Sequence, residues 1–374
     1  MILSGLKYSR FIGEPREWSI VGRDENYAYF GNMNLLVGKN ASGKSRTLNV
    51  IREIANLLAG RINIKQVISP SGHYELIFKN ESYSYKYAFA FKDRIVTEEV
   101  LSYNDKVILD RNRKIFIDTP KPEVLSGIGD SELAVALFDA QDKPYFPDLV
   151  LWGQSLRNHM FANQVEKNRL VKDCTQATED PQDIEPVHTF FKGQQQFGNN
   201  FVSEIKTGMN ELGYSISDIN IRETTAGYSL FVEEDGEYAV SQRDMSQGMF
   251  RALSLFIMLC YARMTNLSLC MLIDDMGEGL DFDRSQMIID MVIKKINNSN
   301  MQFFMTSNDR HVMNQISLKY WSVISRDHTK SIFYDYQNSK EIFDDFKYTG
   351  LNNFDFLATD FFREGFGLID EEND

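Results

Sequence analysis

Residues 33–58, MNLLVGKNASGKSRTLNVIREIANLL, decide the fold of this chain. The segment opens with the apolar run MNLLVG (33–38), a pattern typical of a buried strand. From Lys44 to Leu58 apolar residues recur at helical spacing, and Gly60 is a common residue for ending a helix. Between strand and helix lies GKNASGKS (38–45), which fits the pattern G-x-x-x-x-G-K-[ST]. This order predicts an α/β fold built on a sheet that carries the loop.

A loop of this composition can surround a chain of phosphates. Small residues let consecutive backbone N–H groups point at phosphate oxygens, Lys44 reaches the β- and γ-phosphates, and the Ser45 hydroxyl ligates Mg²⁺. A coincidental glycine-rich turn is the alternative, and the flanking strand and helix argue against it. The sequence therefore predicts a nucleotide and Mg²⁺ site at Gly38, Lys39, Asn40, Ala41, Ser42, Gly43, Lys44 and Ser45.

Two further motifs follow much later in the chain. LCMLIDD (269–275) is an apolar strand that ends in Asp274 and Asp275, and carboxylates at such a strand end can hold Mg²⁺ and orient water. SQG (246–248) opens an apolar helix whose N-terminus can face a phosphate. Each motif has a purely structural alternative: a strand running into a polar turn, and Ser246 acting only as a helix N-cap.

The order of these motifs resembles the ATP-binding cassette (ABC) ATPases, in particular the head domains of the structural-maintenance-of-chromosomes (SMC) and OLD-like group. In that resemblance GKNASGKS is the Walker A loop, LCMLIDD the Walker B strand, SQG the signature and EGLD (278–281) the D-loop. It covers most of residues 1–310. It implies a P-loop NTPase head with a mixed sheet, an antiparallel β-subdomain and a helical lobe that bears the signature, with ATP and Mg²⁺ as ligands.

The resemblance also implies a head-to-tail dimer, or a higher oligomer, around the nucleotides. Ser246, Gln247 and Gly248 of one copy would close on the γ-phosphate held by the other copy, and Asp281 would communicate across the dimer. Arg251 would support the signature loop. Asp274 and Ser45 would hold the metal, and Asp275 would orient or deprotonate the attacking water.

Three departures from the family pattern bear on hydrolysis. The family usually has Glu where this chain has Asp275, and its switch His aligns best with Asn308. Asn can hydrogen-bond a phosphate but cannot carry a proton. The Gln that completes the Mg²⁺ shell is not placed, and Gln66 and Gln154 are candidates by rough location only. Together these departures predict slow hydrolysis, with Asp275 and Asn308 as the catalytic residues.

The remaining pattern divides the chain into three segments. Residues 1–130 form a nucleotide-binding lobe with a β-meander over His73–Ile117, and residues 131–200 form a helical insert with an acidic linker. Residues 201–374 carry a hairpin, the signature helix, the Walker B strand and a tail. Helices are expected over roughly 131–173 and 197–213, and the tail is expected to be one packed helix ending in a frayed acidic terminus.

Composition limits the function classes. The chain has 40 Lys and Arg against 53 Asp and Glu, a net charge of −13, so it has no bulk attraction for nucleic acid or anionic lipid. The three cysteines fit neither a disulfide framework nor a zinc site, which favours a reducing, cytoplasmic location. The N-terminus lacks a signal-peptide pattern, and no apolar run is long enough to span a bilayer.

The leading interpretation is an ABC-type ATPase that binds and slowly hydrolyses ATP, assembles around it, and regulates or scaffolds a separate effector protein. A head without coiled-coil arm or nuclease domain resembles the ATPase components of bacterial anti-phage defence systems. Two alternatives stay open: a non-catalytic, ATP-bound scaffold, and an SMC-like DNA-repair head that clamps DNA. A transporter ATPase has the least support, because nothing suggests a membrane partner.

Overall fold

The computed structural model describes residues 1–113, 116–117, 123–124, 127–137, 146–160, 165–168, 170–174, 185–225, 227–236, 238–296 and 300–366. The fold is mixed α/β with a large mixed sheet, which confirms the predicted class. The chain forms two compact units, Met1–Leu156 with Gln302–Asp374, and Arg157–Met301. These bounds differ from the three segments expected from the sequence, because strands near the C-terminus pair with strands near the N-terminus.

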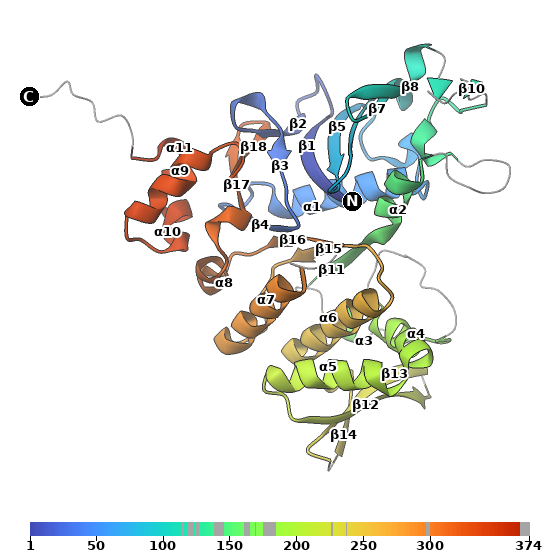
Figure 1. Cartoon of the computed structure of the whole chain (residues 1–374), viewed down its shortest axis with the longest axis vertical. Helices are drawn as coiled ribbons and strands as arrows, with labels where there is room; N and C mark the ends of the chain where they lie inside the picture. The colour runs from blue at the N-terminus through green and yellow to red at the C-terminus, as the bar shows by residue number, and fades with distance from the viewer. Residues whose placement is uncertain are drawn as a thin grey trace, which may run out of the picture. The chain divides into compact units, whose positions relative to one another are not determined.

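A long sheet organises the first unit (Figure 1). Its strand order is β16-β4-β17-β18-β2-β1-β5-β6-β7-β8, with β3 paired to β1. The strands are β1 Ile2–Arg10, β2 Trp18–Gly22, β3 Ala28–Tyr29, β4 Met33–Val37, β5 Gly72–Lys79, β6 Ser84–Lys92, β7 Ile95–Tyr103, β8 Lys106–Asp110, β16 Met301–Thr306, β17 Trp321–Asp327 and β18 Lys330–Asp335. A short pair, β9 Phe116–Ile117 and β10 Glu123–Val124, lies apart from this order.

Strand β4 sits between two parallel neighbours. Thr306 of β16 is opposite Leu36, and Val323 of β17 is opposite Val37. All five residues of β4 are buried, as expected for a strand covered on both faces. The carboxyl ends of the three strands therefore meet at one edge of the sheet. In α/β sheets this edge is where ligands bind.

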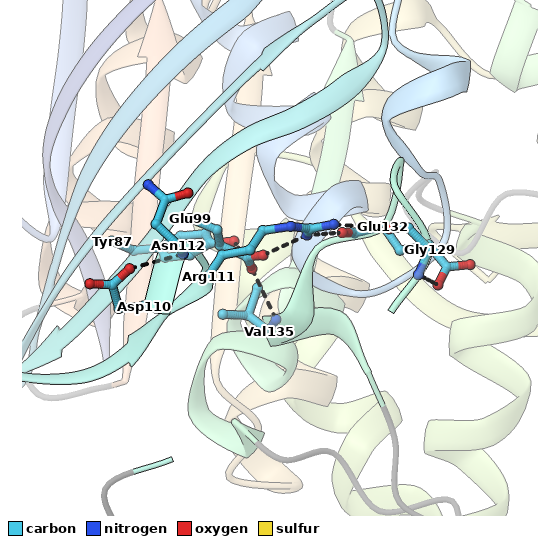
Figure 2. A network of polar contacts seen from close by, with 8 residues as sticks. All are labelled: Tyr87, Glu99, Asp110, Arg111, Asn112, Gly129, Glu132 and Val135. Atoms are coloured by element: carbon cyan, nitrogen blue, oxygen red, sulfur yellow. Dashed lines mark hydrogen bonds and ion pairs between the residues drawn. The ribbon is translucent and has the colours of Figure 1, made fainter. Parts of the chain in front are cut away.

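The meander predicted from His73 onward is present as β5 to β8, which pair antiparallel in succession. Figure 2 shows the polar network that ties it to residues 129–135. Glu99 of β7 is completely buried, and its carboxylate accepts hydrogen bonds from the Tyr87 hydroxyl (2.9 Å) and the Val135 backbone N–H (3.3 Å). The Arg111 guanidinium lies 3.2 Å from the same carboxylate and also donates to the Glu132 carbonyl (2.8 Å).

The helices of the first unit are α1 Lys44–Leu58, α2 Pro147–Ser155, α8 Arg310–Gln315, α9 Lys340–Asp345, α10 Asn353–Ala358 and α11 Phe361–Glu364. Its 3₁₀ turns are η1 Arg23–Glu25, η2 Ile64–Gln66, η3 Arg111–Arg113, η4 Ala134–Ala136, η5 Leu318–Tyr320 and η6 Phe346–Tyr348. Helix α1 matches its predicted bounds.

The C-terminal tail forms three short helices, so the expectation of one packed helix was wrong. Gly350 (φ 72°) and Asp360 (φ 57°) adopt left-handed backbone conformations that interrupt a helix, and Asn352 caps the start of α10. The helices gather beside β17 and β18 around a cluster of phenylalanines (Figure 1). The predicted frayed acidic end lies outside the described residues.

The second unit carries the signature helix. Its helices are α3 Val165–Asn168, α4 Pro186–Phe197, α5 Asn199–Glu211, α6 Gln247–Met264 and α7 Phe282–Ile296. Its strands are β11 Leu156–Met160, β12 Ile216–Thr224, β13 Gly227–Glu234, β14 Tyr238–Ser241 and β15 Leu269–Asp274. Helices α4, α5 and α6 pack on one another (Figure 1). Gly208 permits the α5–α6 contact, since a Cβ there would lie 2.2 Å from Phe256.

A continuous helical region over 131–173 was also a wrong expectation. The described part contains a 3₁₀ turn, helix α2 and then strand β11, which is a neighbour of β15. Pairing with a strand distant in sequence overrides the local helical pattern there. Residues 175–184 of the predicted acidic linker lie outside the described residues. No helix among the described residues is long and apolar enough to cross a membrane.

Candidate nucleotide site

The loop GKNASGKS connects β4 to α1 and closes over its own lysine. The Lys44 side chain is buried, and its ammonium donates to the Gly38 carbonyl at 2.8 Å. Ala41 (φ 62°) and Gly43 (φ 115°) both adopt left-handed conformations, which turns the backbone around this ammonium. The loop thus forms a compact cradle at the N-terminus of a fifteen-residue helix, as a phosphate site requires.

Two glycines of the loop have no room for a side chain. A Cβ at Gly38 would lie 2.5 Å from the Ile324 carbonyl and 2.6 Å from the Ser42 hydroxyl. A Cβ at Gly43 would lie 2.7 Å from the Ser331 hydroxyl. The glycines therefore allow the loop to pack against β17 and β18.

A chain of buried hydrogen bonds holds the loop against β2 and β18. The Trp18 indole N–H donates to the Ser331 hydroxyl (2.9 Å), which donates to the Ser42 carbonyl (2.8 Å). Trp18 begins β2 and Ser331 lies in β18, so three distant segments meet at the loop. The sequence reasoning missed both residues, because neither belongs to a recognisable motif.

A cavity of about 440 Å³ opens beside the start of α1. Arg46 and Arg326 line it together with Trp18, and the Arg46 guanidinium lies 4.8 Å from the centre of the Trp18 ring. Burial and the nearby charges of Arg10 and Arg326 lower the pKa of Arg46. The cavity therefore combines an aromatic face with guanidinium groups, which can stack on a planar ring as well as pair with an anion.

Asn308 lies just after β16, and its switch role remains a prediction. It follows β16 by two positions, and β16 ends beside β4, which ends at the P-loop. Its side chain is exposed, while the neighbouring Asp309 caps α8 by accepting from the His311 N–H (2.6 Å). Asn308 is thus at the same sheet edge as Gly38.

The two acids of LCMLIDD end strand β15 in the second unit. Asp274 is its last residue and Asp275 follows in a left-handed conformation with φ 55°. Such a backbone is uncommon for a residue with a side chain and is found preferentially at functional sites. Both carboxylates are half-buried. Carboxylate oxygens such as those of Asp274 are ligands that suit Mg²⁺.

The signature and D-loop motifs lie together within the second unit. The Ser246 hydroxyl accepts from the Met249 N–H at 3.1 Å, so it does act as the N-cap of α6. Gly248 packs against the D-loop, because a Cβ there would lie 2.7 Å from the Gly279 carbonyl. Buried Arg251 donates to the Glu278 carbonyl. This bond joins the signature helix to the D-loop, and the support of the signature loop by Arg251 remains a prediction.

Asp281 has partners within its own chain. Its carboxylate accepts from the Arg284 backbone N–H (2.9 Å) and pairs with the Arg284 guanidinium (2.7 Å). The backbone hydrogen bond and this charge lower the pKa of Asp281. Gln247 lies beside Gly279 at the same motif junction. The roles of Ser246, Gln247, Gly248 and Asp281 across a dimer remain predictions.

The two candidate glutamines have structural surroundings of their own. The Gln66 side chain accepts from the Asn63 backbone N–H (2.9 Å) in a capping box, and Gln154 is exposed near the end of α2. The two positions therefore give no reason to prefer Gln66 or Gln154 as the glutamine that completes the Mg²⁺ shell. Among the described residues, no group of three or more His, Cys, Asp and Glu side chains could hold a metal ion by itself.

Comparison with solved structures shows which fold this is. The Smc head bound to the C-winged helix domain of ScpA aligns with 89% of this chain and 97% of its own, at a TM-score of 0.54 and 11% identity. The Pyrococcus furiosus Smc head with an extended coiled coil, bound to the C-terminal domain of ScpA, aligns with 92% of this chain and 99% of its own, at a TM-score of 0.51 and 11% identity. The chain has the fold of an SMC head domain. No protein-family profile and no curated protein matches its sequence.

The SMC-head likeness confirms the fold part of the resemblance drawn from the motifs. At 11% identity it extends to the fold and not to function. The OLD-like and anti-phage parts of that resemblance have no counterpart among these structures and stay predictions.

Proposed function

We propose that this chain is an ABC-type ATPase that binds Mg²⁺-ATP and hydrolyses it slowly. The observation that carries the proposal is the P-loop cradle, in which buried Lys44 lies under left-handed Ala41 and Gly43 at the start of α1. The likeness in fold to SMC heads supports it, because it agrees with the resemblance drawn from the order of the motifs.

Different residues of the chain bind different parts of the nucleotide. Backbone N–H groups of residues 38–45 and the Lys44 ammonium bind the phosphates, and Ser45 and Asp274 hold Mg²⁺, which neutralises phosphate charge when bound. The cavity lined by Trp18, Arg46 and Arg326 takes the base and ribose, since its volume of about 440 Å³ suits a ligand of that size. The sequence reasoning did not find this part of the site.

Asp275 orients the attacking water and Asn308 hydrogen-bonds the γ-phosphate. Asp is one methylene shorter than the Glu that the family uses, and Asn cannot exchange a proton. Slow turnover suits a protein whose ATP-bound state lasts. We propose that this state is a dimer, with Ser246, Gln247, Gly248 and Asp281 facing the other copy's nucleotide, that it regulates a separate effector, and that its setting is anti-phage defence in the cytoplasm.

The test is phosphate release from Mg²⁺-ATP by the purified protein, with molar mass followed by light scattering. Lys44→Ala should abolish ATP binding, turnover and assembly, whereas Asp275→Ala should abolish turnover and keep ATP binding. Turnover of tens per second would contradict the slow switch. Turnover that persists in Lys44→Ala would point to a contaminant and contradict the assigned site.

One observation favours a second candidate, a non-catalytic ATP-bound scaffold. The position at which the family uses Glu to activate water is Asp275 here, and the position at which it uses a switch His is Asn308. That candidate predicts ATP-dependent assembly without phosphate release, and with the assembly lost only in Lys44→Ala. A DNA-clamping head predicts instead ATP-dependent DNA binding whose log affinity falls linearly with log salt.

A further inference from the structure

We propose that Asp360 regulates the nucleotide site by holding Lys39, the second residue of the P-loop, and that Lys39 binds the terminal phosphate of ATP when Asp360 releases it. This inference rests on the proposed function, because it needs ATP at the P-loop.

The P-loop carries two ammonium groups with different surroundings. Lys44 is buried and donates to the Gly38 carbonyl inside the loop. The Lys39 side chain is 67% exposed, and its ammonium lies 2.8 Å from the Asp360 carboxylate. A flexible, exposed lysine on the rim of a phosphate cradle can exchange a carboxylate for a phosphate oxygen, since both are anionic acceptors.

Asp360 is presented to the loop by the C-terminal helices. It has a left-handed backbone (φ 57°) between α10 and α11, and one of its carboxylate oxygens is buried without any hydrogen-bond partner in the described part of the chain. A cavity of about 170 Å³ separates these helices from the loop, lined by Lys39, Ser42, Asp360 and Arg363 among others. The cavity thus leaves open space beside the Lys39–Asp360 contact.

The same helices also touch the segment that follows the switch residue Asn308. The Asn353 amide donates to the Ile316 carbonyl (3.0 Å), and the Phe354 N–H donates to the Asn314 side chain (2.8 Å). Asn314 lies in α8, which begins two residues after Asn308. The C-terminal helices thus connect both segments that would face the γ-phosphate, so a shift at either one can change the Asp360–Lys39 contact.

The experiment measures the affinity of the full chain for ATP and for ADP by isothermal titration calorimetry. Asp360→Asn keeps the shape of the side chain and removes its charge. We expect ATP to bind about fivefold tighter, the size of one charge-assisted contact at a partly exposed site. ADP should gain less than twofold, because it lacks the terminal phosphate. In Lys39→Ala/Asp360→Asn the gain should vanish, and Lys39→Arg/Asp360→Asn should retain most of it.

Asp344→Asn is the matched control. It removes the charge from exposed ion pairs of the same tail, which Asp344 makes with Lys340 and with Lys347 (2.6 Å), and should leave both affinities unchanged. Unchanged ATP affinity in Asp360→Asn, an equal gain for ADP, or a gain that survives loss of Lys39 would each overturn the inference. Failure of the wild-type chain to bind ATP at all would instead overturn the proposed function.

Discussion

Removing Arg111 tests whether the residues of the network in Figure 2 depend on one another for their contribution to the free energy of unfolding. The Glu99 side chain is fully buried, and Arg111, 15% exposed, supplies its positive partner at 3.2 Å. Arg111→Met preserves much of the side-chain volume and leaves a buried carboxylate without a counter-charge. Breaking a buried pair in this way typically costs about 3–5 kcal/mol. We expect about 3 kcal/mol, the lower end of that range, because Glu99 keeps its Tyr87 and Val135 donors.

The cost should depend on pH in a definite direction. Burial already raises the pKa of Glu99 above its ordinary value, and Arg111 opposes that rise. Without Arg111 the pKa of Glu99 rises further, because the buried carboxylate loses its opposing positive charge. A folded state whose carboxyl has a raised pKa loses stability as pH rises, until that carboxyl is ionised. The loss caused by Arg111→Met should therefore be larger at pH 8 than at pH 5.

The assay is urea unfolding at pH 5 and pH 8, combined with hydrogen exchange of the β7 amides, which report on this part of the first unit. Lys86→Met is the matched control in the same meander, since it breaks an exposed pair with Asp105 and should cost less than about 1 kcal/mol. The double variant Glu99→Gln/Arg111→Met should recover a large part of the stability. A pH-independent loss, or a double variant no more stable than Arg111→Met, would refute the reasoning.

Four further predictions concern the site and the second unit. Ala41→Gly should raise stability by about 1 kcal/mol in thermal unfolding, because a left-handed alanine (φ 62°) costs about 1–2 kcal/mol; a lower midpoint would contradict this. Trp18→Ala should weaken ATP binding about tenfold by calorimetry, because it removes a stacking surface and the hydrogen bond to Ser331. Trp18→Phe keeps an aromatic ring and should weaken ATP binding less. Gly248→Ala should destabilise by about 1–3 kcal/mol, despite alanine's better helix propensity, since its Cβ would overlap the Gly279 carbonyl at 2.7 Å; unchanged urea unfolding would argue against that packing. Burial lowers the pKa of His159 to about 4, so the folded state favours the neutral ring. The free energy of unfolding should therefore fall as pH drops from 7 to 5, by about 2 kcal/mol more in wild type than in His159→Gln.

Local sequence patterns were sufficient for the elements around the P-loop. The run MNLLVG and the spacing of apolar residues from Lys44 to Leu58 predicted β4 and α1 almost to the residue. The alternation after His73 predicted the meander, and the apolar stretches around 248–264 and 268–275 predicted α6 and β15. These segments succeed because their periodicity is set by which face each one buries, a property that neighbouring residues encode.

The sequence reasoning failed where distant segments decide the local structure. Residues 156–160 have a helix-like composition yet form β11, because a strand elsewhere in the chain is its neighbour. The tail divides into short helices because Gly350 and Asp360 turn left-handed; Gly350 is a helix-ending signal that the prediction of one helix passed over, whereas Asp360 has no strong signal in the sequence.

The sequence by itself determined which residues carry the predicted chemistry of this protein: the glycines and lysine of the loop at residues 38–45, and the acids at the end of β15. Only the tertiary structure decided what surrounds that chemistry. Trp18 and Ser331 reach the loop because β2 and β18 are parallel neighbours, although 313 residues separate the two side chains. Asp360, in the turn between α10 and α11, meets Lys39 across 321 residues. Such contacts depend on which strands pair and where the chain turns. Both are decided by the free energy of the whole fold, so no local stretch of sequence determines them.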